Sequence, residues 1–410
     1  MRTLLLMSQT GGGHKASAQA LKAGFELYYP QRTDVTMVDL LIDHIAPPLN
    51  QLPKTYGVIA NHMPWLWQML WSTGSYPNAT RQLMEGIAYL SEQWVVELLE
   101  EQRPDLLISV HPLVHELIFH ALDVLQWKIP FFTVVTDLAS THPLWFHPRI
   151  TTCFVASDAS HQHALACGLQ PTQVRQYGLP VRPAFADPQP AKAEIRKTLQ
   201  MHPDLPAVLL VGGGDGIGPV AAIAQQLEKH LSSSGQPSGQ LIVICGHNQS
   251  LYQQLRAHQW QIPTHIHGFV DNMPQWMAAA DCIVTKAGPG TIAEATICGL
   301  PILLSGFIPG QEEGNLPFVV EQGAGAFCED PVQIGQTVAR WFGPERQQLA
   351  VMSERSRQLA RPQATQQIEQ AIMKLVVGSS TTGRVPLPVP NAWLFEHTKP
   401  RFMSQRRRTQ

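Results

Sequence analysis

The chain has 410 residues, of which 44% are apolar and 15% are charged. This length exceeds that of one typical domain core and predicts two domains. The formal net charge of -2 argues against a nucleic-acid partner. The 6 cysteines include no C-x-x-C pair, so we expect reduced thiols and neither disulfides nor a zinc framework.

Short apolar, β-branched runs recur along the chain, and each is followed by turn residues and a helical pattern. Continuous apolar strands that alternate with helices are typical of parallel sheets covered on both faces. These runs are too many for one compact sheet, so they predict an α/β protein with two doubly wound, Rossmann-like domains facing across a cleft. The expected strands are 4–8, 35–39, 106–110, 131–136 and 153–156, then 207–211, 241–245, 265–269, 282–285 and 302–305.

A turn-rich stretch at Tyr177–Pro190 divides these strands evenly, which predicts a first domain over 1–180 and a second over 181–376. Beyond them, glycines, serines, prolines and Arg406–Arg408 predict a flexible tail over 377–410. The chain starts directly with a strand and contains no apolar run of about 20 residues. We therefore expect a protein that folds in the cytosol or on the cytosolic face of a membrane.

The first glycine turn, Gly11-Gly12-Gly13-His14, ends a strand and opens a helix. The positive end of the helix dipole disfavours a protonated imidazole there. A neutral His14 that faces the cleft is suited to act as a general base. The alternative is a tight turn with an incidental histidine, and the glycine count alone does not decide between them.

A second turn, Gly212–Gly218, follows the first strand of the second domain and includes Gly213 and Gly214. It does not fit the dinucleotide fingerprint G-x-G-x-x-G, although its glycine content exceeds what a packing turn needs. It is compatible with a loop beside a phosphate or sugar, or with a hinge.

The third turn, Gly288-Pro289-Gly290-Thr291, presents backbone amides where a helix begins. Such a turn predicts a diphosphate cradle. Glu294 lies one turn further on, where a carboxylate can bind vicinal ribose hydroxyls. A Thr291–Glu294 capping box is an alternative interpretation, and the two are compatible.

Polar residues also follow other strands. Asp137 ends a first-domain strand and could orient a histidine, while the loop with Gln311, Glu312 and Asn315 offers hydrogen-bonding groups for a hexose. His111 and His115 have i,i+4 spacing, but no H-E-x-x-H motif occurs and we expect no metal. Because no D-x-D motif occurs either, the negative charge of the leaving group would be stabilised by backbone amides and the helix dipole.

The segment Met63–Trp71 is apolar on nearly every face and contains Trp65 and Trp67. It is too short to span a bilayer, and tryptophan is favoured at membrane interfaces. Two interpretations remain open: an interfacial lipid-docking segment and a buried core helix.

The chain resembles the plant-type monogalactosyldiacylglycerol synthases, a two-domain family that also includes the lipid II-forming N-acetylglucosaminyltransferase of peptidoglycan synthesis. The resemblance spans roughly Met1 to Val376 and rests on long matches in order. They are GGGHKASAQALKAGF, SVHPLVHE, VVTDLASTHPLWFH, YGLPVRPAF, PAVLLVGGGDGIGP, ICGHN, HGFVDNMPQWMAAADCIVTKAGPGTIAEATICGLPILLSGFIPGQEEGN and ARWFGP.

This resemblance implies the GT-B fold, an acceptor- and membrane-binding first domain and a UDP-sugar-binding second domain. It implies that His14 is the base beside the acceptor hydroxyl; Asp137, from its place at a strand end, is the second catalytic candidate. The implied donor-binding residues are Phe269, Val270, Gly288, Gly290, Thr291, Glu294, Gln311, Glu312 and Asn315, and the second glycine turn adds Gly213 and Gly214. The implied acceptor or lipid residues are Trp145 and His147, to which the first glycine turn adds Gly12 and Gly13 and the apolar segment adds Trp65 and Trp67.

The implied reaction is an inverting transfer of galactose from UDP-galactose to the sn-3 hydroxyl of 1,2-diacylglycerol, with no cofactor and with anionic membrane lipids as further partners. Asp215 and Glu313 stand where the plant enzymes are expected to carry Glu and a small residue, so UDP-glucose remains an alternative donor. Two further interpretations stay open, a UDP-sugar 2-epimerase and a non-catalytic UDP-sugar-binding subunit. The lack of a transit peptide predicts a bacterial protein, peripheral on the cytosolic face of a plasma or photosynthetic membrane.

Overall fold

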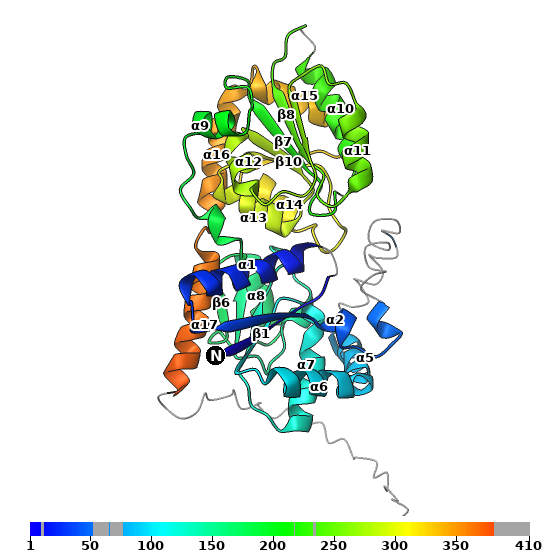
Figure 1. The fold of residues 1–410 in the computed structure, drawn as a ribbon, viewed down its shortest axis with the longest axis vertical. Helices are drawn as coiled ribbons and strands as arrows, with labels where there is room; N and C mark the ends of the chain where they lie inside the picture. Colours follow the sequence, from blue (N-terminus) through cyan, green and yellow to red (C-terminus); the bar gives the residue numbers. More distant parts are fainter. Residues whose placement is uncertain (10–11, 52–64, 66–76, 217, 233–234, 381–410) are drawn as a thin grey trace, which may run out of the picture.

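The computed structural model describes residues 1–9, 12–51, 65, 77–216, 218–232 and 235–380, which form two domains, each built on a parallel sheet (Figure 1). The first sheet holds β1 (Arg2–Met7), β2 (Asp34–Asp39), β3 (Leu106–Ser109), β4 (Phe131–Val134), β5 (Thr152–Val155) and β6 (Val174–Gln176). Its spatial order is β2-β1-β3-β4-β5-β6. All neighbouring strands pair in parallel, as the continuous apolar runs predict.

The second sheet repeats this arrangement and confirms the predicted fold class. Its strands are β7 (Ala207–Val211), β8 (Gln240–Ile244), β9 (Thr264–His267), β10 (Cys282–Thr285), β11 (Ile302–Leu304) and β12 (Gly325–Phe327). They run in the order β12-β11-β10-β7-β8-β9 and are also parallel throughout. In each sheet the order reverses direction beside the first strand, which is where such sheets bind ligands.

The ten predicted strands are all present, and the two unpredicted strands are β6 and β12. Both have 3 residues, and both lie at the edge of a sheet. An edge strand is covered by a neighbour on one side only, so it needs no continuous apolar run. The sequences VRQ and GAF therefore carry no strand pattern that could be recognised.

Helices cover both faces of each sheet. In the first domain they are α1 (Gly12–Tyr28), α2 (Leu40–Asp43), α5 (Pro77–Leu90), α6 (Glu92–Gln102), α7 (His115–Leu125) and α8 (Asp158–Ala166), with the 3-10 turns η1 (Leu49–Gln51), η2 (Pro112–Val114) and η3 (Pro143–Trp145). After η4 (Pro183–Phe185) come α9 (Lys192–Thr198), α10 (Val220–Leu231), α11 (Gln249–Ala257), α12 (Met273–Ala279), α13 (Pro289–Ile297), α14 (Asn315–Val320), α15 (Pro331–Phe342), α16 (Arg346–Leu359) and α17 (Ala364–Ser380). Within the described part of the chain, none of them combines the length and apolarity that crossing a bilayer requires.

The last helix corrects the expected domain boundary. Ile368 and Ile372 of α17 are fully buried in a cluster that contains Leu21 and Phe25 of α1, so this helix completes the core of the first domain (Figure 1). The hydroxyl of Thr365 also donates to the carbonyl of Val181 over 2.6 Å. The assignment of 181–376 to the second domain is therefore wrong at its end, because the apolar stripe of a helix does not say which domain it covers.

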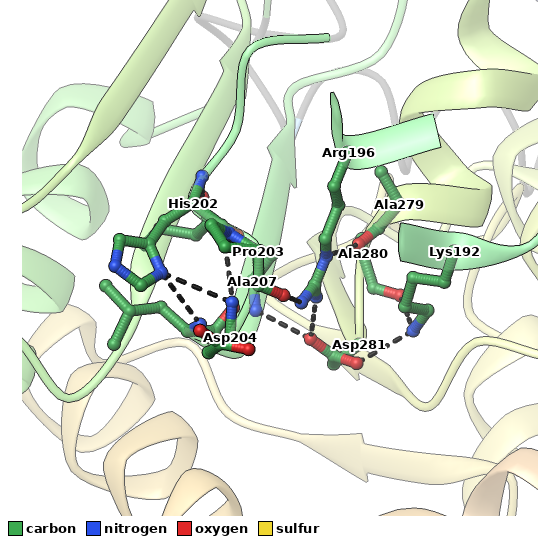
Figure 2. A network of polar contacts seen from close by, with 11 residues as sticks. Lys192, Arg196, His202, Pro203, Asp204, Ala207, Ala279, Ala280 and Asp281 are labelled. Atoms are coloured by element: carbon green, nitrogen blue, oxygen red, sulfur yellow. Dashed lines mark hydrogen bonds and ion pairs between the residues drawn. The ribbon is translucent and has the colours of Figure 1, made fainter. Parts of the chain in front are cut away.

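A partly buried carboxylate fixes the start of the second domain. Asp281, just before β10, accepts from Arg196 over 2.6 Å, from Lys192 over 2.7 Å and from the backbone amide of Ala207 over 2.7 Å (Figure 2). Burial by itself would raise the pKa of Asp281, but Lys192, the Ala207 amide and Arg196 together hold it below its usual value. This network joins α9 to the amino-terminal edge of the sheet, opposite the edge where ligands bind.

We predict that Asp281→Asn lowers the free energy of unfolding by about 3 kcal/mol at pH 7, because it leaves two cations without their carboxylate. Since the folded-state pKa is depressed, this stabilisation exists above the unfolded pKa and is lost as pH falls through the folded pKa. Urea denaturation followed by circular dichroism measures the effect. The matched control Asp204→Asn, at an exposed position in the same region, should change stability by less than about 0.5 kcal/mol; equal effects for both variants would contradict the prediction.

Candidate active site

The two domains touch through the turns that follow their first strands. A methyl group added at Gly12, where α1 begins, would lie 4.0 Å from the Cα atom of Gly214, in the turn after β7. Beside this contact the amide of Gly314 donates to the hydroxyl of Ser140 over 2.7 Å. The first and second glycine turns predicted from the sequence therefore face each other across the domain boundary.

His14 lies in the first turn of α1 and is buried. Its Nδ1 atom lies 2.9 Å from the carbonyl oxygen of Val110 and 2.9 Å from the hydroxyl of Thr136. A carbonyl oxygen only accepts hydrogen bonds, so we assign the proton of the neutral ring to Nδ1. The Nε2 atom then keeps its lone pair, and among the described residues no hydrogen bond to it is found.

Burial lowers the pKa of His14 to about 4, while the hydrogen bond to Val110 opposes this shift. The ring centroid of His111 lies 4.6 Å away and that of Trp145 6.0 Å away. The neutral imidazole expected from the sequence is thus supported, although burial is its main cause and the expected cause was the helix dipole. A neutral ring with a lone pair on Nε2 can accept a proton.

Asp137 does not orient His14, contrary to the triad-like expectation. Its carboxylate accepts from the indole Nε1 of Trp145 over 2.6 Å, and Gln311 from the second domain also hydrogen-bonds to it. Burial raises the pKa of Asp137 to about 7, with a further upward contribution from Glu312, while the bond from Trp145 opposes the shift. Asp137 therefore braces Trp145 beside His14 and contacts the second domain.

The predicted acceptor residues have different surroundings. Gly12 and Gly13 are exposed at the start of α1, and Trp65 is 68% exposed. Trp145 is fully buried, so the structure corrects its expected role as a lipid-contacting residue. His147 is also buried, with its Nε2 atom 3.5 Å from Glu116 Oε1. Trp67 and most of the segment 63–71 lie outside the described residues.

On the donor side, the two predicted phosphate turns lie on either side of one lysine. A methyl group added at Gly213 would lie 3.5 Å from Cε of Lys286, and one added at Gly288 would lie 3.2 Å from its Nζ atom. Gly213 has a φ of 74°, a conformation that favours glycine and brings its backbone toward the lysine. Sequence reasoning missed Lys286, although a basic residue directly after an apolar strand and before a glycine turn was a usable signal.

The expected sugar-binding loop joins this lysine to the domain boundary. Glu312 forms an ion pair with Lys286 through Oε1 and accepts from the amide of Ile308 over 3.0 Å through Oε2. Asn315 accepts from the amide of Ala139 over 3.1 Å and donates to the carbonyl of Ala287 over 2.9 Å. Its amide group is thus occupied on both sides, so the structure gives Asn315 a bridging position, which differs from the expected contact with the sugar.

The remaining donor residues line the carboxyl ends of the second sheet. Gly290 and Thr291 form the first turn of α13. Glu294 follows in the same helix, where burial raises its pKa to about 7 and Arg182 opposes the shift. Phe269 is 57% exposed and stacks on His247 with ring centroids 4.6 Å apart and planes within 9° of parallel, and Val270 beside it is partly buried.

The histidines weighed as metal ligands are used elsewhere. Nδ1 of His115 lies 3.1 Å from the carbonyl of Pro112, and Nε2 lies 2.8 Å from the hydroxyl of Thr133. Within the described ranges, no cluster of three or more histidine, cysteine or carboxylate side chains could hold a metal ion.

Two facing parallel sheets, with a glycine-lined turn on one side and a buried neutral histidine on the other, form the GT-B fold. Solved structures share this fold: MurG of Acinetobacter baumannii is 17% identical over 91% of this chain and all of its own chain, with a TM-score of 0.57. The S. aureus MnaA structure with UDP is 15% identical over 91% of this chain and 96% of that chain, with a TM-score of 0.60.

The sequence comparisons identify the family. Residues 14–181 match the profile of monogalactosyldiacylglycerol synthase, and 207–340 match the glycosyltransferase family 28 C-terminal domain. The Spinacia oleracea monogalactosyldiacylglycerol synthase is 44% identical over 92% of this chain and 72% of its own length, and synthase 1 of Arabidopsis thaliana is 43% identical over 92% and 71%. The chain belongs to the monogalactosyldiacylglycerol synthase family.

The same comparisons overturn one expectation. The sequence predicted a bacterial protein on the cytosolic face of a plasma or photosynthetic membrane. That expectation is wrong, because these relatives are plant proteins whose names place them in the chloroplast.

We predict that long-range proton–nitrogen NMR of histidine-labelled protein shows His14 as the Nδ1–H tautomer from pH 8 down to about pH 5. The reason is that a pKa of about 4 keeps the ring neutral throughout this range. The His14→Asn variant assigns the signal. A free histidine side chain titrates near pH 6.5, and titration of His14 in that range would contradict the buried neutral ring.

Proposed function

We propose that this protein transfers galactose from UDP-galactose to the sn-3 hydroxyl of 1,2-diacylglycerol and releases monogalactosyldiacylglycerol and UDP. The names of its relatives support the reaction. The observation that carries the proposal is the position of His14. Its Nε2 atom has a free lone pair, and the helix that carries His14 begins at Gly12, next to the glycine turn at Gly214. That geometry brings a proton acceptor to a nucleotide-sugar cradle.

The proposed donor site follows from the contacts of the second domain. Uracil would lie against the backbone at Phe269 and Val270, and Glu294 would accept from the ribose hydroxyls. The diphosphate would lie at the first turn of α13, where free backbone amides and the helix dipole favour an anion. The hexose would then extend toward Gln311 and Glu312, next to the domain boundary.

The proposed chemistry is one in-line displacement. The glycerol hydroxyl gives its proton to Nε2 of His14 as its oxygen bonds to the anomeric carbon from the face opposite UDP. The bond between that carbon and the β-phosphate oxygen breaks, and its electron pair leaves with UDP. One displacement inverts the configuration and gives a β-linked product. We propose that this reaction needs neither metal nor cofactor.

We predict that His14→Ala lowers kcat by about 10²- to 10⁴-fold, the usual contribution of a positioned general base. Its affinity for UDP, measured by calorimetry, should stay at the wild-type value because the donor site lies in the other domain. Product is measured as labelled hexose in an organic extract after incubation with diacylglycerol and each UDP-hexose. Near-normal turnover in this variant would rule out the assigned base.

The matched control is Lys22→Ala, on an exposed part of the same helix, where a 3.9 Å ion pair with Glu26 contributes little. This variant should keep full activity, and so should wild-type protein treated with a chelator. A product that forms faster from UDP-glucose than from UDP-galactose would overturn the choice of donor. UDP binding without turnover on any lipid would favour a non-catalytic subunit.

We further propose that the first domain docks on an anionic lipid surface, since diacylglycerol has to reach His14 from a membrane. Supporting observations are the exposed apolar side chains of α5 and α6. Leu83 is 64% exposed, Tyr89 72%, Leu90 60% and Trp94 38%. Apolar and aromatic residues grouped on adjacent helices are typical of a membrane-contacting surface.

We predict that wild-type protein sediments with vesicles of phosphatidylglycerol, phosphatidylcholine and diacylglycerol, and that a Leu83→Glu, Leu90→Glu double variant binds them at least tenfold more weakly. Two carboxylates would have to enter the interfacial region, which is unfavourable. Val351→Glu, at an apolar position of α16 that is 61% exposed, is the matched control and should bind normally. Equal binding by all three proteins would exclude this surface.

A further inference from the structure

The ion pair between Lys286 and Glu312 lies where the proposed donor diphosphate would bind. Lys286 directly follows β10, and its side chain is 22% exposed, while that of Glu312 is 5% exposed. The ammonium group lies beside Gly288, the residue that precedes α13, and the lysine stem passes beside Gly213. One cation therefore lies between both glycine turns.

This placement is electrostatically unfavourable unless an anion is present. The amino-terminal end of α13 carries a partial positive charge, and the Gly288 cap provides no side-chain acceptor for it. A lysine ammonium beside it adds positive charge to the same partly buried region. Glu312 supplies the anion in this structure, held in position by the amide of Ile308.

Glu312, which competes with phosphate for Lys286 in this account, lies close to the first domain. Its loop lies at the boundary with the first domain, because Gly314 donates to Ser140 and Asn315 accepts from Ala139. Gln311, which precedes Glu312, hydrogen-bonds to Asp137 across that boundary. Glu312 thus lies in a loop that contacts both Lys286 and the first domain.

We propose that Lys286 is a further catalytic residue, whose ammonium group binds the diphosphate of the nucleotide-sugar donor in exchange for Glu312. This inference rests on the proposed function. In this structure Glu312 pairs with the ammonium group of Lys286. When the donor binds, its phosphates take the place of Glu312 beside the lysine, and the Glu312 carboxylate becomes available to accept from hexose hydroxyls. Phosphate binding at Lys286 therefore frees the Glu312 carboxylate to bind the hexose.

The exchange also places a positive charge next to the leaving group. As the bond between the anomeric carbon and the β-phosphate oxygen breaks, that oxygen keeps the electron pair and UDP gains one negative charge. The ammonium group of Lys286 neutralises this charge without transferring a proton, while the proton from the acceptor hydroxyl goes to His14. Fixed cations at developing charge are a common source of rate enhancement.

Calorimetry with uridine, UMP and UDP tests the assignment. For Lys286→Met we expect the affinity for uridine to stay within twofold of wild type and the affinity for UDP to fall about 10- to 100-fold, the usual range for a lost charge-assisted hydrogen bond. Retained uridine binding shows that the variant is folded. A fall in uridine and UDP affinity by the same factor, or no fall in either, would overturn the proposal.

The Glu312→Gln variant should change the affinity for UDP in the opposite direction. It removes the competing anion, so UDP should bind several-fold more tightly than to wild type, whereas turnover of the UDP-hexose should fall because a sugar acceptor is lost. Weaker UDP binding in this variant would contradict the exchange. Lys286→Arg keeps the charge and should retain most of the UDP affinity.

The double variant Lys286→Met, Glu312→Gln separates a direct phosphate contact from an indirect effect. If Lys286→Met acted only by leaving an unpaired carboxylate beside the phosphates, the double variant would bind UDP as tightly as Glu312→Gln does, and the proposal would fail. We expect it to stay at least tenfold weaker. Failure of wild-type protein to prefer UDP over uridine would overturn the donor proposal itself, whereas an unaltered preference in Lys286→Met overturns only this inference.

Discussion

Every residue of the candidate site depends on one constraint, the parallel direction of all strands in both sheets. Parallel strands end at a common edge, and the two sheets turn these edges toward each other (Figure 1). His14 follows β1, Asp137 follows β4, Gly213 follows β7 and Lys286 follows β10. Residues separated by more than 250 positions therefore meet at one boundary. The opposite edge of the second sheet carries the Asp281 network, which contributes to stability.

The second determinant is the burial of ionisable side chains near the boundary, which sets their protonation states. Burial keeps His14 uncharged, and the same cause raises the pKa values of Asp137 and Glu294 to about 7. A buried charge without a partner is costly. The ion pair of Lys286 with Glu312 is the exception, because each group neutralises the other.

Contacts across the boundary are both apolar and polar: Leu138 and Ala156 of the first domain lie in one buried hydrophobic cluster with Ile292 of the second domain. Asn315 and Gly314 bond to the loop that follows β4, and Gln311 bonds to Asp137 in that loop. A hydrogen bond of this kind contributes about 1 kcal/mol to stability. Substrate entry and UDP release would exchange these bonds for water.

Apolar runs and glycines act through local backbone physics, so they were enough to predict the two-sheet fold, ten of the strands, the three glycine turns and the position of His14 at a helix start. Tertiary structure alone decided which groups meet. Asp137 accepts a hydrogen bond from the buried Trp145, and Asn315 bridges the two domains. Helix α17 packs in the core of the first domain, and Lys286 lies between two glycine turns. These outcomes depend on side-chain burial or on partners far away in the chain, and spacing along a sequence carries no information about either.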